Sequence, residues 1–207
     1  QKRGYPIDGI VFKYNQCDEY NAAGRTDHHF KGGIAYKFYD EEYETTLKDI
    51  EWTMGRTGVL TPVAIFEPVD ADGSIIEKAS LHNITVAHDL LGGLCFGWKG
   101  QKISVFKANM IIPQISKAEA DDEKTKYYLT LPYVCPVCGG DVEVRKENDS
   151  EMLYCVNPQC EGKLVNRIEH FFGKKGLDAK GISKATISKL IDLGWVTRVA
   201  DVFDLSR

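Results

Sequence analysis

The chain has 207 residues, enough for one or two ordinary domains or several small ones, and a formal net charge of −4. This net charge argues against a uniformly basic protein that coats nucleic acid. No run of about eighteen apolar residues occurs, and residues 1–14 lack the apolar region and cleavage site of a signal peptide. We therefore expect a soluble, cytoplasmic protein without a membrane segment.

The first elements in the chain are two predicted strands, residues 7–13 and 32–39, separated by a polar loop. Each strand carries a lysine at or near its end, Lys13 in the first and Lys37 in the second. Lysines at such places are usually exposed surface residues, so these two positions alone do not indicate a function.

From residue 45 the pattern changes to short strands separated by turns, and the turns are predicted at 55–58 and 70–73. The predicted strands are residues 47–54, 59–66, 74–79, 102–107 and 127–131. Asn83 is expected to cap a short helix that ends at Gly92 and Gly93. Five strands with a helix between the third and the fourth are the layout of an OB barrel, a frequent nucleic-acid platform.

Four cysteines follow the barrel with the spacing C-x2-C, sixteen residues, C-x4-C: Cys135, Cys138, Cys155 and Cys160. Together they complete the tetrahedral shell that structural zinc prefers. Two disulfides are the alternative, but they need an oxidising compartment, which nothing near the N-terminus indicates. Because all four ligands are thiolates, no coordination position is open for water. We expect the metal to fold a small domain rather than to catalyse.

The hydrophobic period becomes helical after the cysteines. We predict one helix that ends at Gly173 and a second that ends at Gly194, joined by the glycine-bearing connection 177–183. Seven Lys or Arg lie between residues 163 and 189 against two acidic residues, which predicts a cationic surface. Such a hairpin either presents N–H groups and positive charge to a phosphate or is a plain hairpin with a solvated lysine face.

The order of the motifs is more specific than any one of them. The segments DGIVFK (8–13), AYKF (35–38), GRTGVLTPVA (55–64) and ASLHN (79–83), followed by the four cysteines, closely resemble the bacterial NAD-dependent DNA ligases. The resemblance covers essentially the whole chain and implies a multidomain, mainly β protein. Its parts would be the end of an adenylation domain (1–40), an OB-fold domain (41–125), a four-cysteine zinc finger (126–163) and the start of a helix-hairpin-helix domain (164–207).

The resemblance implies a parent enzyme that seals nicks in duplex DNA through enzyme-AMP and DNA-adenylate intermediates. NAD would donate the AMP, and magnesium would neutralise phosphate charge. Lys13 and Lys37 match the family's nucleotidyltransferase motifs IV and V, so they would be catalytic and cofactor-binding, with their ammonium groups at the adenylate phosphate. The family's nucleophilic lysine lies in a K-x-D-G sequence, which these 207 residues lack. We therefore expect this chain not to adenylate itself.

The resemblance also implies a protein that binds nicked duplex DNA independently of base sequence, and we expect a monomer. The predicted DNA-binding residues are Arg56, Lys107, Lys180 and Lys184. Arg56 lies between two glycines on an exposed turn, although a simple turn residue is the alternative. Two departures weaken the match. Residues 107–113 read KANMIIP where relatives often have Arg-Ala-Gly-Asp. A second hairpin glycine that is expected near Ser183 is missing.

Two other classes of protein remain open. A non-enzymatic OB and zinc-finger module that binds nucleic acid would leave Lys13 and Lys37 as ordinary surface residues. A different covalent nucleotidyltransferase, such as an RNA ligase or a capping enzyme, shares the lysine-bearing strands and the OB fold. The zinc finger followed by a helical hairpin argues against that second class.

Overall fold

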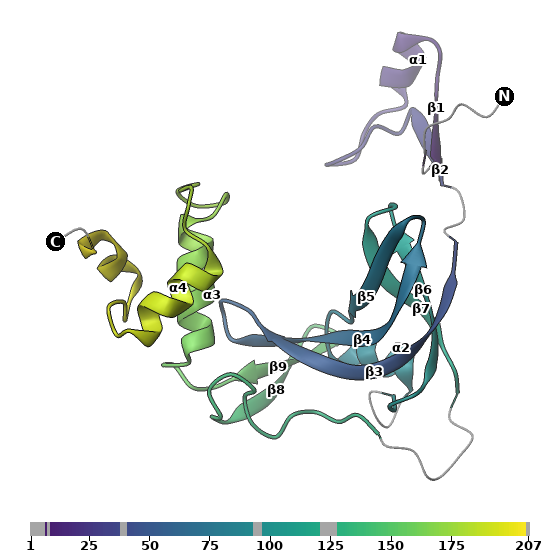
Figure 1. Cartoon of the computed structure of the whole chain (residues 1–207). Helices are drawn as coiled ribbons and strands as arrows, with labels where there is room; N and C mark the ends of the chain where they lie inside the picture. Colours follow the sequence, from purple (N-terminus) through teal and green to yellow (C-terminus); the bar gives the residue numbers. More distant parts are fainter. Residues whose placement is uncertain (1–6, 8, 38–40, 93–96, 121–127, 206–207) are drawn as a thin grey trace.

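The computed structural model describes residues 7, 9–37, 41–92, 97–120 and 128–205 (Figure 1). Three parts follow one another along the chain: a two-stranded hairpin, a large sheet and a group of helices. The hairpin and the helices lie at opposite ends of the large sheet (Figure 1). None of the described helices is both long and apolar enough to cross a membrane. This mainly β arrangement of several parts confirms the predicted fold class.

The N-terminal hairpin consists of β1 (Gly9–Lys13) and β2 (Gly33–Lys37), which pair antiparallel. Both predicted strands are therefore present among the described residues. Between them lies α1 (Cys17–Ala22), where the sequence predicted only a loop. Its sequence CDEYNA has neither an apolar face nor a side-chain cap, so the pattern gave little sign of a helix. Asp8 and residues 38–40 lie outside the described residues.

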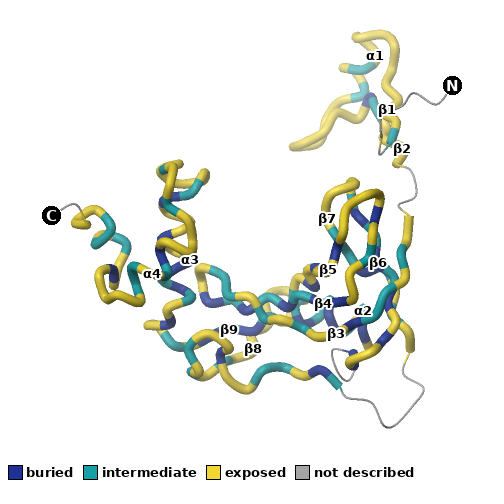
Figure 2. Tube along the Cα trace, viewed as in Figure 1, coloured by how far each residue is buried: buried dark blue, intermediate teal, exposed yellow. Residues whose placement is uncertain are grey.

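The barrel is formed by β3 (Tyr43–Met54), β4 (Val59–Ala71), β5 (Ser74–Ser80), β6 (Lys102–Ala108) and β7 (Ile112–Ala118). The strand order is β7-β6-β3-β4, and β5 pairs with β4. Helix α2 (Ile84–Leu91) follows β5, and the Asn83 side chain accepts a hydrogen bond from the Val86 amide at 2.8 Å. The predicted cap is thus confirmed. The barrel core, dark in Figure 2, includes fully buried side chains: Leu47, Leu60, Phe66, Leu81, Ile84 and Leu91.

The prediction of a closing strand at residues 127–131 was wrong. Tyr127 lies outside the described residues, and Tyr128 makes only an isolated bridge with Trp98. Leu129 is buried and packs into the barrel core. The apolar residues of this segment therefore fill the barrel without joining its hydrogen-bond ladder.

The fifth barrel strand is β7 instead, which begins at the end of the KANMIIP segment. The β6–β7 turn is made by Asn109 and Met110, at positive φ angles of 52° and 63°. Ala108 and Ile112 pair on either side of this turn. Pro113 is tolerated in β7 because β7 is an edge strand of the sheet, where a missing N–H donor costs little.

The four-cysteine segment adds a second hairpin to the barrel sheet. β8 (Val142–Glu147) and β9 (Ser150–Cys155) pair antiparallel. β9 also pairs with β4, through Leu60 opposite Leu153 and Val59 opposite Tyr154. The sheet is therefore seven-stranded and continuous from the barrel into the cysteine-bearing hairpin.

The helical end contains α3 (Glu161–Phe172), α4 (Lys184–Asp192) and the 3-10 helix η1 (Val199–Asp204). As predicted, α3 stops before Gly173, and Gly194 follows α4. Ser183, which replaces the expected glycine, caps α4 because its Oγ accepts a hydrogen bond from the Thr186 amide at 3.2 Å. The two helices and the segment after them share a small core: Val165, Ile168, Phe172, Ile187 and Val196.

Candidate metal centre and nucleic-acid interface

The four cysteines converge from three short segments. Cys135 and Cys138 lie on a turn before β8, Cys155 ends β9, and Cys160 precedes α3. The four are free thiols, which argues against the disulfide alternative. Their Sγ atoms all lie within 4.8 Å of one another, and those of Cys138 and Cys155 are 3.7 Å apart. Tetrahedral zinc with Zn–S bonds of about 2.3 Å requires S···S separations of about 3.8 Å, so the cluster fits a four-thiolate zinc site.

The electrostatics of the cluster favour a bound cation. Burial raises the pKa of the Cys138 thiol, but hydrogen bonds from the Gly140 amide and the Asn157 side chain outweigh it and lower the pKa to about 6. Burial raises the pKa of Cys155 to about 12 and also raises that of Cys160. These buried thiols therefore resist joint ionisation unless a divalent metal compensates the charge. With four protein ligands, the site suits a structural metal.

The β3–β4 turn beside this cluster exposes Arg56, as predicted. Gly58 ends the turn with a φ of 96°, a conformation that favours glycine. Helix α3 holds the turn from outside the barrel. Asn166 Nδ2 donates to the Met54 carbonyl at 3.0 Å, and Arg167 Nε donates to the Arg56 carbonyl at 3.3 Å. Helix α3 therefore fixes the backbone of the turn that carries Arg56.

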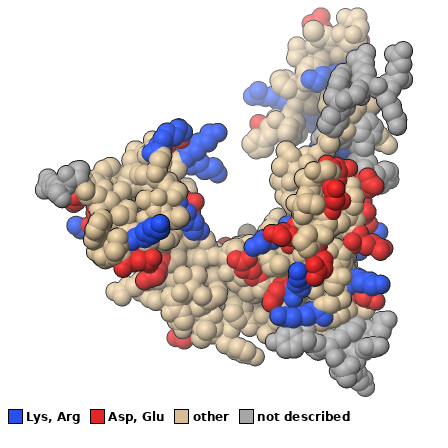
Figure 3. Space-filling view, viewed as in Figure 1, with Lys and Arg blue, Asp and Glu red and all other residues tan. Residues whose placement is uncertain are grey.

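Basic side chains gather on the helical end (Figure 3). Of the seven counted in the sequence, six are exposed, and we call this set of residues the helical cationic patch: Arg167, Lys174, Lys175, Lys180, Lys184 and Lys189. The seventh, Lys163, is buried at 7% exposure. The cationic surface is therefore smaller than the sequence indicated.

The two predicted DNA-binding lysines of the helical hairpin both lie in this patch. Lys180 Nζ is 2.9 Å from Asp178 Oδ1, and the Lys180 side chain is 85% exposed. Lys184 Nζ donates to Asn166 Oδ1 at 2.9 Å and lies 4.0 Å from Glu169 Oε2. Exposed ion pairs of this kind contribute little to stability, so phosphates compete well for both ammonium groups.

Lys107 is buried, unlike the other predicted DNA-binding residues. Its Nζ donates to Ser74 Oγ at 2.8 Å and lies 4.0 Å from Asp72 Oδ2, and its side chain is 8% exposed. The Tyr43 hydroxyl donates to Asp72 Oδ1 at 3.0 Å. These residues join β3, β5, β6 and the β4–β5 turn in one polar network. A DNA contact by Lys107 stays a prediction, and the burial of its ammonium argues for a structural role.

Lys13 and Lys37 project from one face of the N-terminal hairpin. Lys13 pairs with Gly33, and Lys37 pairs with Gly9, at opposite ends of the ladder. Directly opposite residues of paired strands share a face, and so do alternate residues along one strand. Both lysines therefore point to the same face, and their Cα atoms are separated by about 13 Å along the strand direction. The rest of this face carries small side chains: Gly9, Val11, Gly33 and Ala35.

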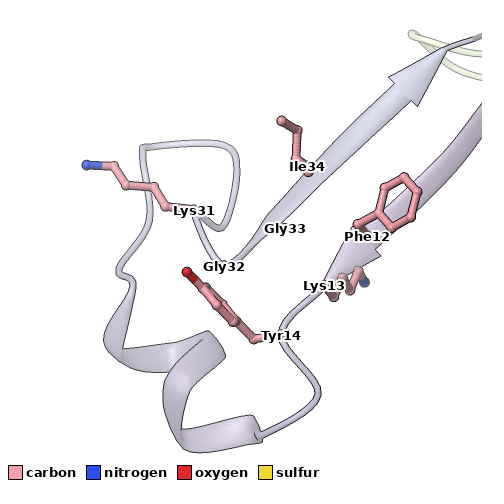
Figure 4. Close-up of a pocket in the computed structure, with 7 residues that line it drawn as sticks. All are labelled: Phe12, Lys13, Tyr14, Lys31, Gly32, Gly33 and Ile34. Atoms are coloured by element: carbon pink, nitrogen blue, oxygen red, sulfur yellow. The ribbon is translucent and has the colours of Figure 1, made fainter.

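The two lysines have different surroundings. Lys13 lines a pocket of about 340 Å³ where β1 and β2 meet the loop between them (Figure 4). The pocket is lined by Phe12, Lys13, Tyr14, Lys31, Gly32, Gly33 and Ile34. Lys37 Nζ instead donates to Asn109 Oδ1 at 2.5 Å, on the β6–β7 turn of the barrel. The structure thus brings the two lysines to one face but not into one pocket.

Three residues by which α3 joins the cysteine cluster and the Arg56 turn were not predicted from the sequence to have this role: Lys163, Asn166 and Arg167. The spacing Cys160-x2-Lys163 was the available signal, because it puts the lysine on the first turn of the helix that the last cysteine begins. Asn166 and Arg167 follow about one turn later. Because Lys163 belongs to a run of seven basic residues, the sequence predicted a surface position for it.

Residues 44–127 match the family model described as the NAD-dependent DNA ligase OB-fold domain. The chain is 44% identical to the DNA ligase of Lachnoclostridium phytofermentans over 199 residues, which cover 96% of this chain and 29% of that protein. It is 39% identical to the DNA ligase of Ruminiclostridium cellulolyticum over 203 residues, 98% of this chain and 30% of the relative. The chain thus spans about three tenths of the length of these relatives. Residues 44–127 therefore belong to the NAD-dependent DNA ligase OB-fold family, and over nearly its whole length the chain is similar to DNA ligases.

Proposed function

We propose that this chain is a DNA-binding part of an NAD-dependent ligase that seals nicks in duplex DNA through enzyme-AMP and DNA-adenylate intermediates. The similarity to DNA ligases supports the parent activity. The observation that carries the DNA-binding role is the hydrogen bond from Arg167 to the Arg56 carbonyl. It joins the helical cationic patch to the exposed turn of the barrel. Two positive groups on separate elements thereby keep a fixed spacing, which suits binding to a phosphate backbone.

The metal site would serve this geometry. Cys135, Cys138, Cys155 and Cys160 would hold zinc, which supplies a cross-link between the barrel sheet and α3 when bound. Cys155 ends a strand paired to the barrel, and Cys160 begins the helix that holds the Arg56 turn. The role of the metal would therefore be structural, not catalytic.

Lys13 and Lys37 would act on phosphate rather than on the DNA duplex. The small side chains on their shared face let a nucleotide approach the backbone closely. Their ammonium groups would stabilise negative charge on the adenylate phosphate, together with magnesium. These 207 residues contain no K-x-D-G sequence, so the nucleophile would come from another part of the parent protein.

Fluorescence anisotropy with labelled nicked and intact duplexes of two unrelated base sequences tests the DNA-binding role. We expect the 207-residue chain to bind both sequences alike, with affinity that falls steeply as salt rises. Arg56→Gln and Lys180→Gln should each weaken binding and reduce the slope of log K against log salt by about one. Lys117→Gln, at a 72% exposed side chain on the distant edge strand β7, is the matched control. No binding at low salt would exclude the proposal.

A sealing assay with the parent ligase separates the enzyme from a non-enzymatic nucleic-acid module. Lys13→Ala and Lys37→Ala should each slow sealing about 100-fold or more, because each removes a charge at the transferring phosphate. Binding of nicked duplex should change little in both variants. Sealing at the normal rate would leave these lysines as surface residues and favour the non-enzymatic module. We also propose that the protein is cytoplasmic and monomeric. Sedimentation at several concentrations tests the monomeric state.

A further inference from the structure

Lys163 is a buried ammonium that has no carboxylate partner among the described residues. Only 7% of the residue is exposed, and none of the ion pairs among the described residues includes it. Its Nζ donates to the Cys155 carbonyl at 2.6 Å and to the Asn157 carbonyl at 2.8 Å. Two neutral acceptors satisfy its hydrogen bonds but do not balance its charge. A buried charge left without compensation is costly, so the source of negative charge must lie elsewhere.

The proposed metal site would supply that charge. Both carbonyls that accept from Lys163 belong to the loop from Cys155 to Cys160, which supplies two of the four thiolates. Lys163 itself lies three residues after Cys160, on the first turn of α3. Four thiolates around one Zn²⁺ leave a net charge of about −2. The buried Lys163 ammonium would offset part of that charge.

The other side of the Lys163 side chain touches the Arg56 turn. A Cβ placed on Gly58 would lie 2.3 Å from Lys163 Cε and 3.0 Å from its Nζ. The Cys155 amide donates to the Gly58 carbonyl at 2.9 Å, next to the lysine. Lys163 therefore fills the space between the metal loop and the end of the turn, and only a glycine at position 58 leaves room for it.

We propose that Lys163 is a positioning residue that couples the metal site to the Arg56 turn. Its ammonium balances the metal–thiolate charge and ties the Cys155 and Asn157 carbonyls to α3, so metal occupancy determines how Arg56 is presented to DNA. Asn166 and Arg167, one turn further along α3, extend the same connection to Met54 and Arg56. The inference rests on the proposed zinc and DNA-binding roles and adds a charged residue that links them.

The test uses Lys163→Met, which keeps the length of the side chain and removes its charge, in the 207-residue chain. Zinc affinity is measured by competition with a chelator. We expect the dissociation constant of zinc to rise about 10- to 100-fold, as for other groups that support metal ligands. Lys189→Met, at an exposed lysine of α4, is the control and should leave zinc affinity unchanged. Where Lys163→Met does not fold, Lys163→Gln, which retains a hydrogen-bond donor, takes its place.

Hydrogen exchange at the amides of residues 55–58 gives a second measurement. Exchange there should quicken in zinc-loaded Lys163→Met, while the amides of the α3–α4 core stay protected. In a double-mutant cycle, Arg56→Gln should weaken DNA binding less in the Lys163→Met background than in the unmodified chain. Unchanged zinc affinity together with unchanged exchange would overturn the inference. A chain that binds zinc but no DNA would overturn the DNA-binding role alone, whereas a chain that binds no zinc would overturn the zinc role and this inference.

Discussion

Gly58→Ala is the substitution that most directly tests the packing around the metal loop. An alanine at a φ of 96° costs about 1 kcal/mol of backbone strain. Its methyl group would lie 2.3 Å from Lys163 Cε and 3.2 Å from the Cys155 carbonyl oxygen, and overpacking of a filled space costs about 1–3 kcal/mol. We expect the free energy of unfolding of the zinc-loaded chain to fall by about 2–4 kcal/mol.

Urea titration followed by circular dichroism measures this loss, and two other glycines separate its components. Gly73→Ala has a φ of 78° but no heavy atom within 4 Å of the new methyl, so it should cost only the strain, about 1 kcal/mol. Gly55→Ala, in the same turn as Gly58, meets the Val59 carbonyl oxygen at 3.4 Å without a positive φ and should be nearly neutral. Equal losses for Gly58→Ala and Gly73→Ala would refute the argument. Gly58→Ala should cost less in a Lys163→Ala background than in the unmodified chain, because the atoms that clash are then absent.

Three further predictions follow from the sites described above. Chelation should remove one tightly bound zinc per chain and abolish hydrogen-exchange protection in residues 133–160; metal analysis of the purified chain that finds no zinc would contradict this. Lowering the pH should release zinc as protons compete for the thiolates, which a zinc indicator dye follows, and stable retention at strongly acid pH would oppose the four-thiolate assignment. Burial and the hydrogen bond to Asp72 raise the pKa of Tyr43 to about 12. The neutral Tyr43 phenol should therefore stabilise the fold fully below a pH of about 10 and lose this effect as the pH rises through 12. The difference in unfolding free energy between the unmodified chain and Tyr43→Phe should shrink over that range. A constant difference would contradict the raised pKa of Tyr43.

The sequence predicted best what local pattern determines. The cysteine spacing predicted the four side chains that lie together and could hold a metal, and the polar residue before an apolar helix identified Asn83 as a cap. The closing strand was misplaced because residues 127–131 have the apolar composition of a strand, while β7 contains Pro113 and follows an Asn-Met turn. Hydrogen-bond partners, not composition, decide between these segments, and the partners are distant in sequence.

The charged residues show a second limit of sequence reasoning. Lys107 and Lys163 look like surface cations in the sequence, but both are buried in the structure. Lysine is rarely buried, so composition favours the surface. What reverses this preference is the arrangement of acceptors: Ser74 and Asp72 near Lys107, and the carbonyls of the metal loop near Lys163. Such acceptors become neighbours only when the chain is folded.

The pairing of β4 with β9 has a consequence for how the protein is made. Val59 and Leu60 leave the ribosome well before Leu153 and Tyr154, their partners in the sheet. Until β9 is synthesised, this part of β4 is an open edge with unpaired backbone groups, which is a template for pairing with another chain. In the proposed zinc site, metal capture by Cys155 and Cys160 would then help to hold β9 in place. A shortage of zinc during translation should therefore appear first as aggregation of newly made protein, before any loss of activity in molecules that have already folded.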